Sequence, residues 1–90
     1  IIEYRREDGK LHRIIGPAFK ICEENIWSYQ WWENGLLIAM YLGSNEELFQ
    51  CVNHSQYELK KLPFKAKWKD YEQSITLIEI KTLIKNRSVK

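Results

Sequence analysis

The dipeptide Asn34-Gly35, which lies between two apolar segments, restricts the fold of this chain more than any other feature. Asparagine followed by glycine favours a type I′ turn, because both central residues of that turn have positive φ. A two-residue loop fixes the register of the strands on either side. The expected pairs are Trp32–Leu37, Trp31–Ile38, Gln30–Ala39, Tyr29–Met40, Ser28–Tyr41 and Trp27–Leu42. In this register Trp27, Tyr29 and Trp31 lie on one wholly apolar face, which predicts that they belong to the core.

A second turn is expected at Asp8-Gly9, since this dipeptide suits the same turn type. The expected pairs there are Glu7–Lys10, Arg6–Leu11, Arg5–His12 and Tyr4–Arg13, and the expected core-facing residues are Ile2, Tyr4, Leu11 and Ile15. Gly16-Pro17 predicts a tight turn, and the segment Ala18 to Glu23 predicts a strand. The N-terminal half is therefore expected to be an antiparallel β-meander of two or more hairpins.

The C-terminal half follows a different pattern. Ser44 to Glu47 resembles a helix capping box, and the apolar residues after it recur at helical spacing, so a helix is expected near residues 45–61, before Pro63. Residues 70–86 are rich in β-branched side chains and form either a strand or a helix that starts near Asp70. With 90 residues and 44% apolar content, the chain is expected to form one small soluble α+β domain spanning residues 1–90.

The segment from Asp8 to Ala18 reads DGKLHRIIGPA. It resembles a short β-hairpin repeat (MORN-like, DGKLHR-x-x-GPA type) of uncharacterised phage, giant-virus and bacterial proteins. The segment from Trp31 to Leu37 is similar to the opening of a second copy, although Ile38-Ala39 stands where the repeat has His-Arg, and Gly-Pro-Ala is missing. The resemblance covers about half of the chain. It implies a β-meander and a phage-like origin, and the repeat has no common activity to carry over.

Charge is unevenly distributed along the chain, although the net charge is only +2. Residues 21–59 contain six acidic and no basic residues, whereas residues 60–90 contain nine basic and three acidic ones. The longest apolar run, Leu36 to Leu42, is far too short to span a membrane, and the first residues lack the apolar segment of a signal peptide. Two cysteines in such a chain predict reduced thiols and a cytoplasmic protein, in the host cytoplasm if it is encoded by a phage.

The sequence offers little for catalysis or metal binding. Cys51-x-x-His54 has the spacing of half a zinc knuckle, but no second half accompanies it. The paired acidic residues are sequence neighbours, and the four glycines are too scattered for a phosphate-binding loop. We therefore expect no enzyme activity, no cofactor and no metal.

The face of the second hairpin opposite the core carries an aromatic group. In the register expected from Asn34-Gly35, Trp32, Leu37 and Tyr41 lie together there, flanked by polar residues. Tryptophan and tyrosine are enriched in binding hot spots. These three residues are the candidate partner-binding site, and the expected function is a non-enzymatic protein-binding module of unknown partner. Its specific form, a phage-encoded inhibitor or modulator of a host protein, rests on the resemblance.

An alternative function uses the basic aromatic strip at residues 60–71. In an extended strip, lysines lie on one side and aromatic rings on the other, as in proteins that bind single-stranded nucleic acid. The residues expected to bind nucleic acid are Lys61, Lys65, Lys67, Trp68 and Lys69. A solvated strand with its aromatic side chains in the core has the same alternation.

Overall fold

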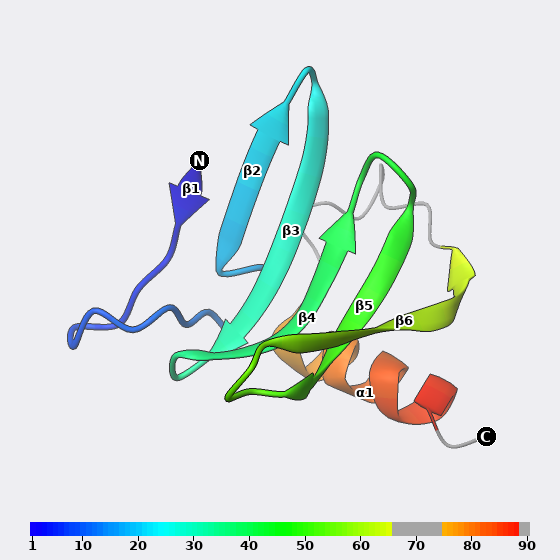
Figure 1. Ribbon diagram of the computed structural model, residues 1–90. Coiled ribbons are helices and arrows are strands. Elements are labelled where there is room, and N and C mark those ends of the chain that lie inside the picture. The colour runs from blue at the N-terminus through cyan, green and yellow to red at the C-terminus, as the bar shows by residue number, and fades with distance from the viewer. Residues whose placement is uncertain (66–74, 89–90) are drawn as a thin grey trace.

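The computed structural model describes residues 1–65 and 75–88, and shows a six-stranded antiparallel sheet followed by one helix (Figure 1). Each strand lies beside the next one in the chain, so the sheet is a simple meander. The strands are β1 (Ile2–Glu3), β2 (Phe19–Glu23), β3 (Ile26–Glu33), β4 (Leu36–Leu42), β5 (Glu47–Asn53) and β6 (Glu58–Lys65), and the helix is α1 (Leu77–Ser88). The expected α+β class with N-terminal antiparallel hairpins is confirmed.

The prediction of a helix near residues 45–61 is wrong, because this segment forms the hairpin of β5 and β6. Residues 43–46 form the turn before β5, and Glu46 has a φ of 53°. In the strand, Leu48 reaches the core, and pairing with β4 and β6 satisfies the backbone on both sides. Tertiary pairing of this kind regularly outweighs a local helical signal.

The C-terminal segment is a helix, one of the two structures expected for it. Among the described residues it begins at Leu77, later than the start expected near Asp70. A capping box fixes this end: the amide of Glu79 donates to Thr76 Oγ1 and the amide of Thr76 donates to Glu79 Oε1, both at 3.1 Å. The true helix start signal is thus Thr76 with Glu79, not Ser44 with Glu47.

The turn at Asn34-Gly35 has the expected form, with φ values of 52° and 84°, and Trp32 pairs with Leu37 as predicted. Beyond that pair the register shifts by one residue, because a β-bulge at Ile38 inserts an extra residue into β4. The observed pairs are Trp31–Ala39, Gln30–Met40 and Tyr29–Tyr41. The expected pairs from Trp31–Ile38 to Ser28–Tyr41 are therefore wrong, and the residues of β4 after the bulge lie on the faces opposite to those predicted.

The first turn also differs from the prediction. Arg5 is bridged to Leu11, and Arg6 and Lys10 close a three-residue loop in which Gly9 alone has positive φ, at 87°. The Asp8 carboxylate accepts a hydrogen bond from the amide of Lys10 at 3.1 Å, which lowers the pKa of Asp8. The two-residue register expected here is wrong. Ile15, expected in the core, is 65% exposed.

This N-terminal hairpin docks onto the turn between β3 and β4. The amide of Gly35 donates to Leu11 O at 2.9 Å, and the amide of Asn34 donates to His12 Nδ1 at 3.0 Å. The Arg6 guanidinium also donates to the Asn34 side chain. Residues 11–13 therefore close the edge of β3 at the end where β2 no longer covers it.

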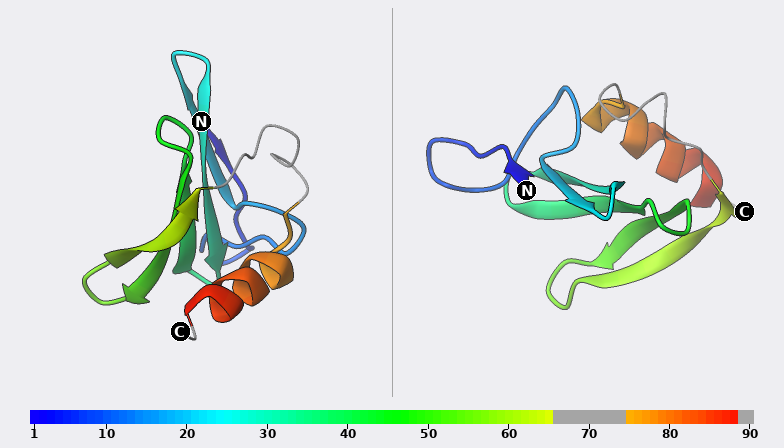
Figure 2. Two further views of the ribbon diagram at one scale, coloured as in Figure 1. Left: turned by 90° about the vertical axis from the view of Figure 1, so that its right-hand side faces the viewer. Right: turned by 90° about the horizontal axis from the view of Figure 1, so that it is seen from above.

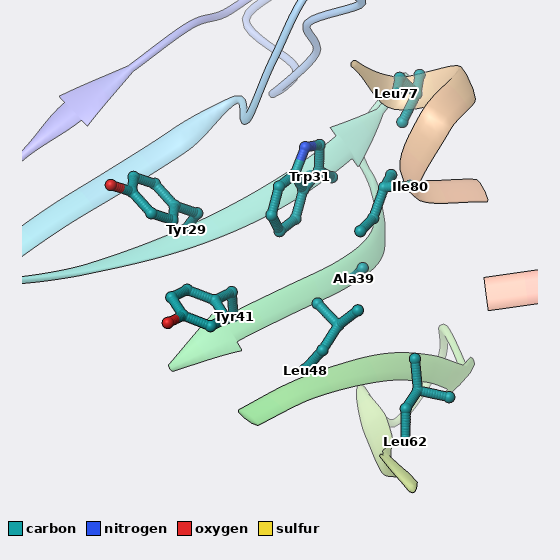
Figure 3. Packing of buried hydrophobic residues seen from close by; sticks show 8 residues of the cluster. All are labelled: Tyr29, Trp31, Ala39, Tyr41, Leu48, Leu62, Leu77 and Ile80. Carbon is teal, nitrogen blue, oxygen red and sulfur yellow. The ribbon is translucent and has the colours of Figure 1, made fainter. Parts of the chain in front are cut away.

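The core lies between α1 and one face of the sheet (Figure 3). Its buried members are Tyr29, Trp31, Ala39, Tyr41, Leu48, Leu62, Leu77 and Ile80. The rings of Tyr29 and Tyr41 stack with centroids 6.0 Å apart, and Trp31 Nε1 donates to Ile75 O at 3.0 Å. The prediction that Tyr29 and Trp31 lie in the core is confirmed, whereas Trp27 only packs against its edge.

Gly35→Ala is expected to destabilise the protein by about 1–2 kcal/mol, because an L side chain at positive φ is strained. The added Cβ would also lie 3.3 Å from the Lys10 side chain, whereas no atom lies within 4 Å of a Cβ at Gly9. Gly9→Ala is the matched control and should cost the same or less. Urea unfolding curves of both variants test this, and a neutral Gly35→Ala would contradict the type I′ turn.

Candidate protein-binding face

Helix α1 covers one face of the sheet, and no other described element covers the opposite face (Figure 2, right). We call that opposite face the open face. Directly paired residues project from the same face, so the register sets its members. A row of paired residues crosses it from β2 to β5, and a second pair lies beside the row on β3 and β4. The row is Phe19, Gln30, Met40 and Phe49, and the second pair is Trp32 and Leu37.

Trp32 lies on the open face close to the turn between β3 and β4. Its ring is half-buried, and its Nε1 donates to Gln30 Oε1 at 2.8 Å, while Gln30 Nε2 lies 3.8 Å from Met40 Sδ. The Gln30 amide therefore joins the two apolar side chains and satisfies the indole N–H. Trp32 is held in one orientation with part of its ring accessible.

Tyr57 extends this surface from the turn between β5 and β6. That turn bends to the side of the sheet away from α1 (Figure 2, right). The ring centroids of Trp32 and Tyr57 lie 6.1 Å apart at an angle of 52°, a favourable tilted contact. Tyr57 has a φ of 52° and is 55% exposed. It is thus the most accessible aromatic side chain of this face.

The three residues predicted to bind a partner do not form an exposed patch. Tyr41 is 5% exposed and lies on the core face, because the bulge at Ile38 reverses the faces of β4. Leu37 shares the open face with Trp32 as predicted, yet it is also only 5% exposed. Trp32 alone remains accessible. Sequence reasoning missed Tyr57 because it placed this residue within a helix.

The strip predicted to bind nucleic acid is described only in part. Lys61 is exposed on β6 and forms a 3.0 Å ion pair with Glu47. Lys65 ends β6. Lys67, Trp68 and Lys69 lie outside the described residues. Lys61 therefore has an acidic partner within the sheet, which competes with a phosphate for its charge.

Of the cysteines and histidines, Cys51 and His54 line a common pocket, whereas His12 and Cys22 lie outside it. Cys22 is exposed, Cys51 is buried, and both are free thiols. His54 is exposed in the turn after β5. Within residues 1–65 and 75–88, no group of three or more His, Cys, Asp or Glu side chains is placed to hold a metal ion. Over the same ranges, no helix has the length and apolar character needed to cross a membrane.

Comparison with known proteins finds no relative of this chain. No protein-family model matches the chain, no curated protein matches its sequence, and no solved structure matches its fold. The resemblance to a MORN-like hairpin repeat therefore stays a prediction.

Two adjacent tryptophans test the assignment of the two faces. Trp31 is 1% exposed in the core, so Trp31→Ala should cost about 3–5 kcal/mol of unfolding free energy. Trp32→Ala should cost about 1–2 kcal/mol, because this ring is half-buried and loses one hydrogen bond. Urea denaturation measures both values. Equal losses would show that Trp32 is also a core residue.

Proposed function

We propose that the protein is a non-enzymatic protein-binding module and that its partner contacts the open face. The observation that carries this proposal is the Trp32–Tyr57 pair: a half-buried tryptophan held by Gln30, with an exposed tyrosine against it. Aromatic side chains of this kind supply much of the binding energy at protein interfaces. Their position on a paired strand and a short turn keeps the loss of side-chain entropy on binding small.

The surroundings of this pair also suit a protein partner. Met40 and Phe49 continue the apolar surface across the sheet, and both are half-buried. The ion pair between Lys61 and Glu47 lies at its β5–β6 side. An apolar centre with a charged rim is the usual composition of a protein interface. The expected partner surface therefore presents apolar side chains to Trp32 and a hydrogen-bonding group to the Tyr57 hydroxyl.

The specific form of this function is a phage-encoded inhibitor or modulator of a host protein, which acts in the host cytoplasm. The support for this form is the resemblance of residues 8–18 to hairpin repeats of phage and viral proteins. No contact among the described residues adds to it. The open-face proposal does not depend on it.

Site-specific photo-crosslinking tests the open face. The photoreactive residue p-benzoylphenylalanine replaces Tyr57 in one variant and Ile78, which is 69% exposed on α1, in the matched control. In a bacterial lysate, the variant at position 57 should give one crosslinked product of defined mass. This product should disappear with excess unlabelled wild-type protein and weaken about tenfold or more when Trp32→Ala is added.

Equal crosslinking from positions 57 and 78, or a product that Trp32→Ala leaves unchanged, would contradict the proposal. The alternative function is tested in parallel by titrating labelled single-stranded DNA and RNA at about 50 mM salt, where phosphate contacts are strong. Binding that falls with Lys61→Gln and not with Trp32→Ala would favour the nucleic-acid function instead.

A further inference from the structure

The turn between β3 and β4 donates both of its central amides to the N-terminal hairpin, which returns beside the end of β3 (Figure 1). The amide of Gly35 donates to Leu11 O at 2.9 Å, and the amide of Asn34 donates to His12 Nδ1 at 3.0 Å. His12 is half-buried where it accepts this bond. One of the two acceptors at this contact is therefore a titratable ring nitrogen.

The hydrogen bond from Asn34 to His12 requires the neutral form of the ring. Neutral imidazole has one nitrogen that donates and one that accepts, whereas both nitrogens donate in the protonated form. Because Nδ1 accepts here, the proton of the neutral ring lies on Nε2. Protonation would place an N–H at Nδ1 against the N–H of Asn34, so the bond would be lost and two donors would face one another.

The charged groups at this contact are cations. The Arg6 guanidinium donates to the Asn34 side chain, and the Lys10 side chain lies against Gly35. A positive charge on His12 would be the third at this contact, and like charges at close range repel one another. No carboxylate among the described residues forms an ion pair with His12.

The carboxylates that lie close to this contact along the chain have other partners. Glu33 precedes Asn34 and forms a 3.0 Å ion pair with Lys81 of α1. The Asp8 carboxylate accepts from the amide of Lys10 at 3.1 Å. These carboxylates therefore do not neutralise a protonated His12 in the docked arrangement.

The hairpin is held at both ends by bonds that join only backbone groups. The amide of Tyr4 donates to Ala18 O, and the amide of Leu77 at the start of α1 donates to Ile14 O, both at 2.8 Å. Between these ends, residues 5–13 are joined to the sheet at the β3–β4 turn and by the amide of Arg13, which donates to Trp32 O at 3.4 Å. A bond of this length is weak. Loss of the His12 bond would therefore loosen residues 5–13 and leave the ends in place.

We propose that residues 5–13 form a pH-sensitive flap over the end of β3 and that the His12 ring fastens it. Histidine changes its charge between about pH 8 and pH 5. The docked flap binds fewer protons than the released flap, because docking needs the neutral ring, so docking is strongest at about pH 7.5 and weakens as the pH falls towards about 5.5. Release frees the amides of Asn34 and Gly35 and the carbonyl of Trp32 at the edge of the sheet.

The test is solvent exchange of backbone amides in the ¹⁵N-labelled protein between about pH 7.5 and 5.5, with each rate corrected for its intrinsic pH dependence. Protection of the Asn34 and Gly35 amides should fall about tenfold or more as the pH is lowered, with the midpoint at which the His12 ring titrates. Protection of the Tyr4 and Leu77 amides should stay constant. Asp8 stays ionised in this range, because the Lys10 amide lowers its pKa.

Two matched variants separate His12 from the second histidine of the chain. In His12→Asn the side-chain oxygen can accept from the Asn34 amide and does not titrate, so protection should no longer depend on pH. His54 is exposed in the turn after β5, and His54→Asn should keep the wild-type pH dependence. A ¹H–¹⁵N spectrum of the histidine rings should show the neutral His12 ring protonated on Nε2.

Unchanged protection of Asn34 and Gly35 down to about pH 5.5, or a loss that persists in His12→Asn, would overturn the proposal. An equal loss at Tyr4 and Leu77 would also overturn it, because the whole protein would then unfold. If His12→Asn does not fold, the wild-type protein still decides: a neutral ring protonated on Nδ1, or a loss of protection whose midpoint differs from that of His12, would contradict the flap. These measurements need no binding partner, so they are independent of the function proposed for the open face.

Discussion

The β-bulge at Ile38 is the constraint on which the rest of the structure depends. The hairpin starts from a turn that fixes Trp32 opposite Leu37, and the bulge then moves every later residue of β4 by one position. As a result, Ala39 and Tyr41 face α1, where Tyr41 stacks on Tyr29 and is buried. In an unbroken ladder Met40 would occupy that face and Tyr41 would lie in solvent. The bulge therefore gives the sheet one closed core and leaves the opposite face with a continuous half-buried apolar surface.

The two faces of the sheet differ in their chemistry. The open face presents Trp32 and Tyr57, and its chemistry is aromatic and apolar. A group formed by Tyr4, Arg13 and Lys20 lies on the other face, beyond the Tyr29 side of the core, and its chemistry is cationic. The N-terminal hairpin connects them, because it carries Tyr4 and Arg13 and also docks on the turn that follows Trp32.

The sequence predicted those features that depend on local backbone chemistry. Asn34-Gly35 specified its turn because few other dipeptides adopt two positive φ values, and the alternating Tyr29 and Trp31 identified the core face. The bulge left no trace in the alternation of residues, so the prediction from the sequence placed Tyr41 and Met40 on the wrong faces of the sheet. The segment 45–61 carried a capping-box pattern and apolar spacing compatible with a helix, and only pairing with β4 makes it a hairpin. Because of this error, Tyr57 was not predicted to lie on the open face. The burial of Lys20 could not be predicted either, because it depends on contacts between segments far apart in the sequence.

The measurement that tests this account most directly is the cross-strand pattern of β3 and β4, read from backbone nuclear Overhauser effects in a uniformly labelled sample. The bulge at Ile38 predicts contacts between Trp32 and Leu37 at the turn, followed by contacts of Trp31 with Ala39 and of Tyr29 with Tyr41. The continuous ladder, with contacts of Trp31 to Ile38 and of Tyr29 to Met40, would contradict it. In that case Tyr41 would lie on the open face, and both the core and the proposed binding surface would have to be reassigned.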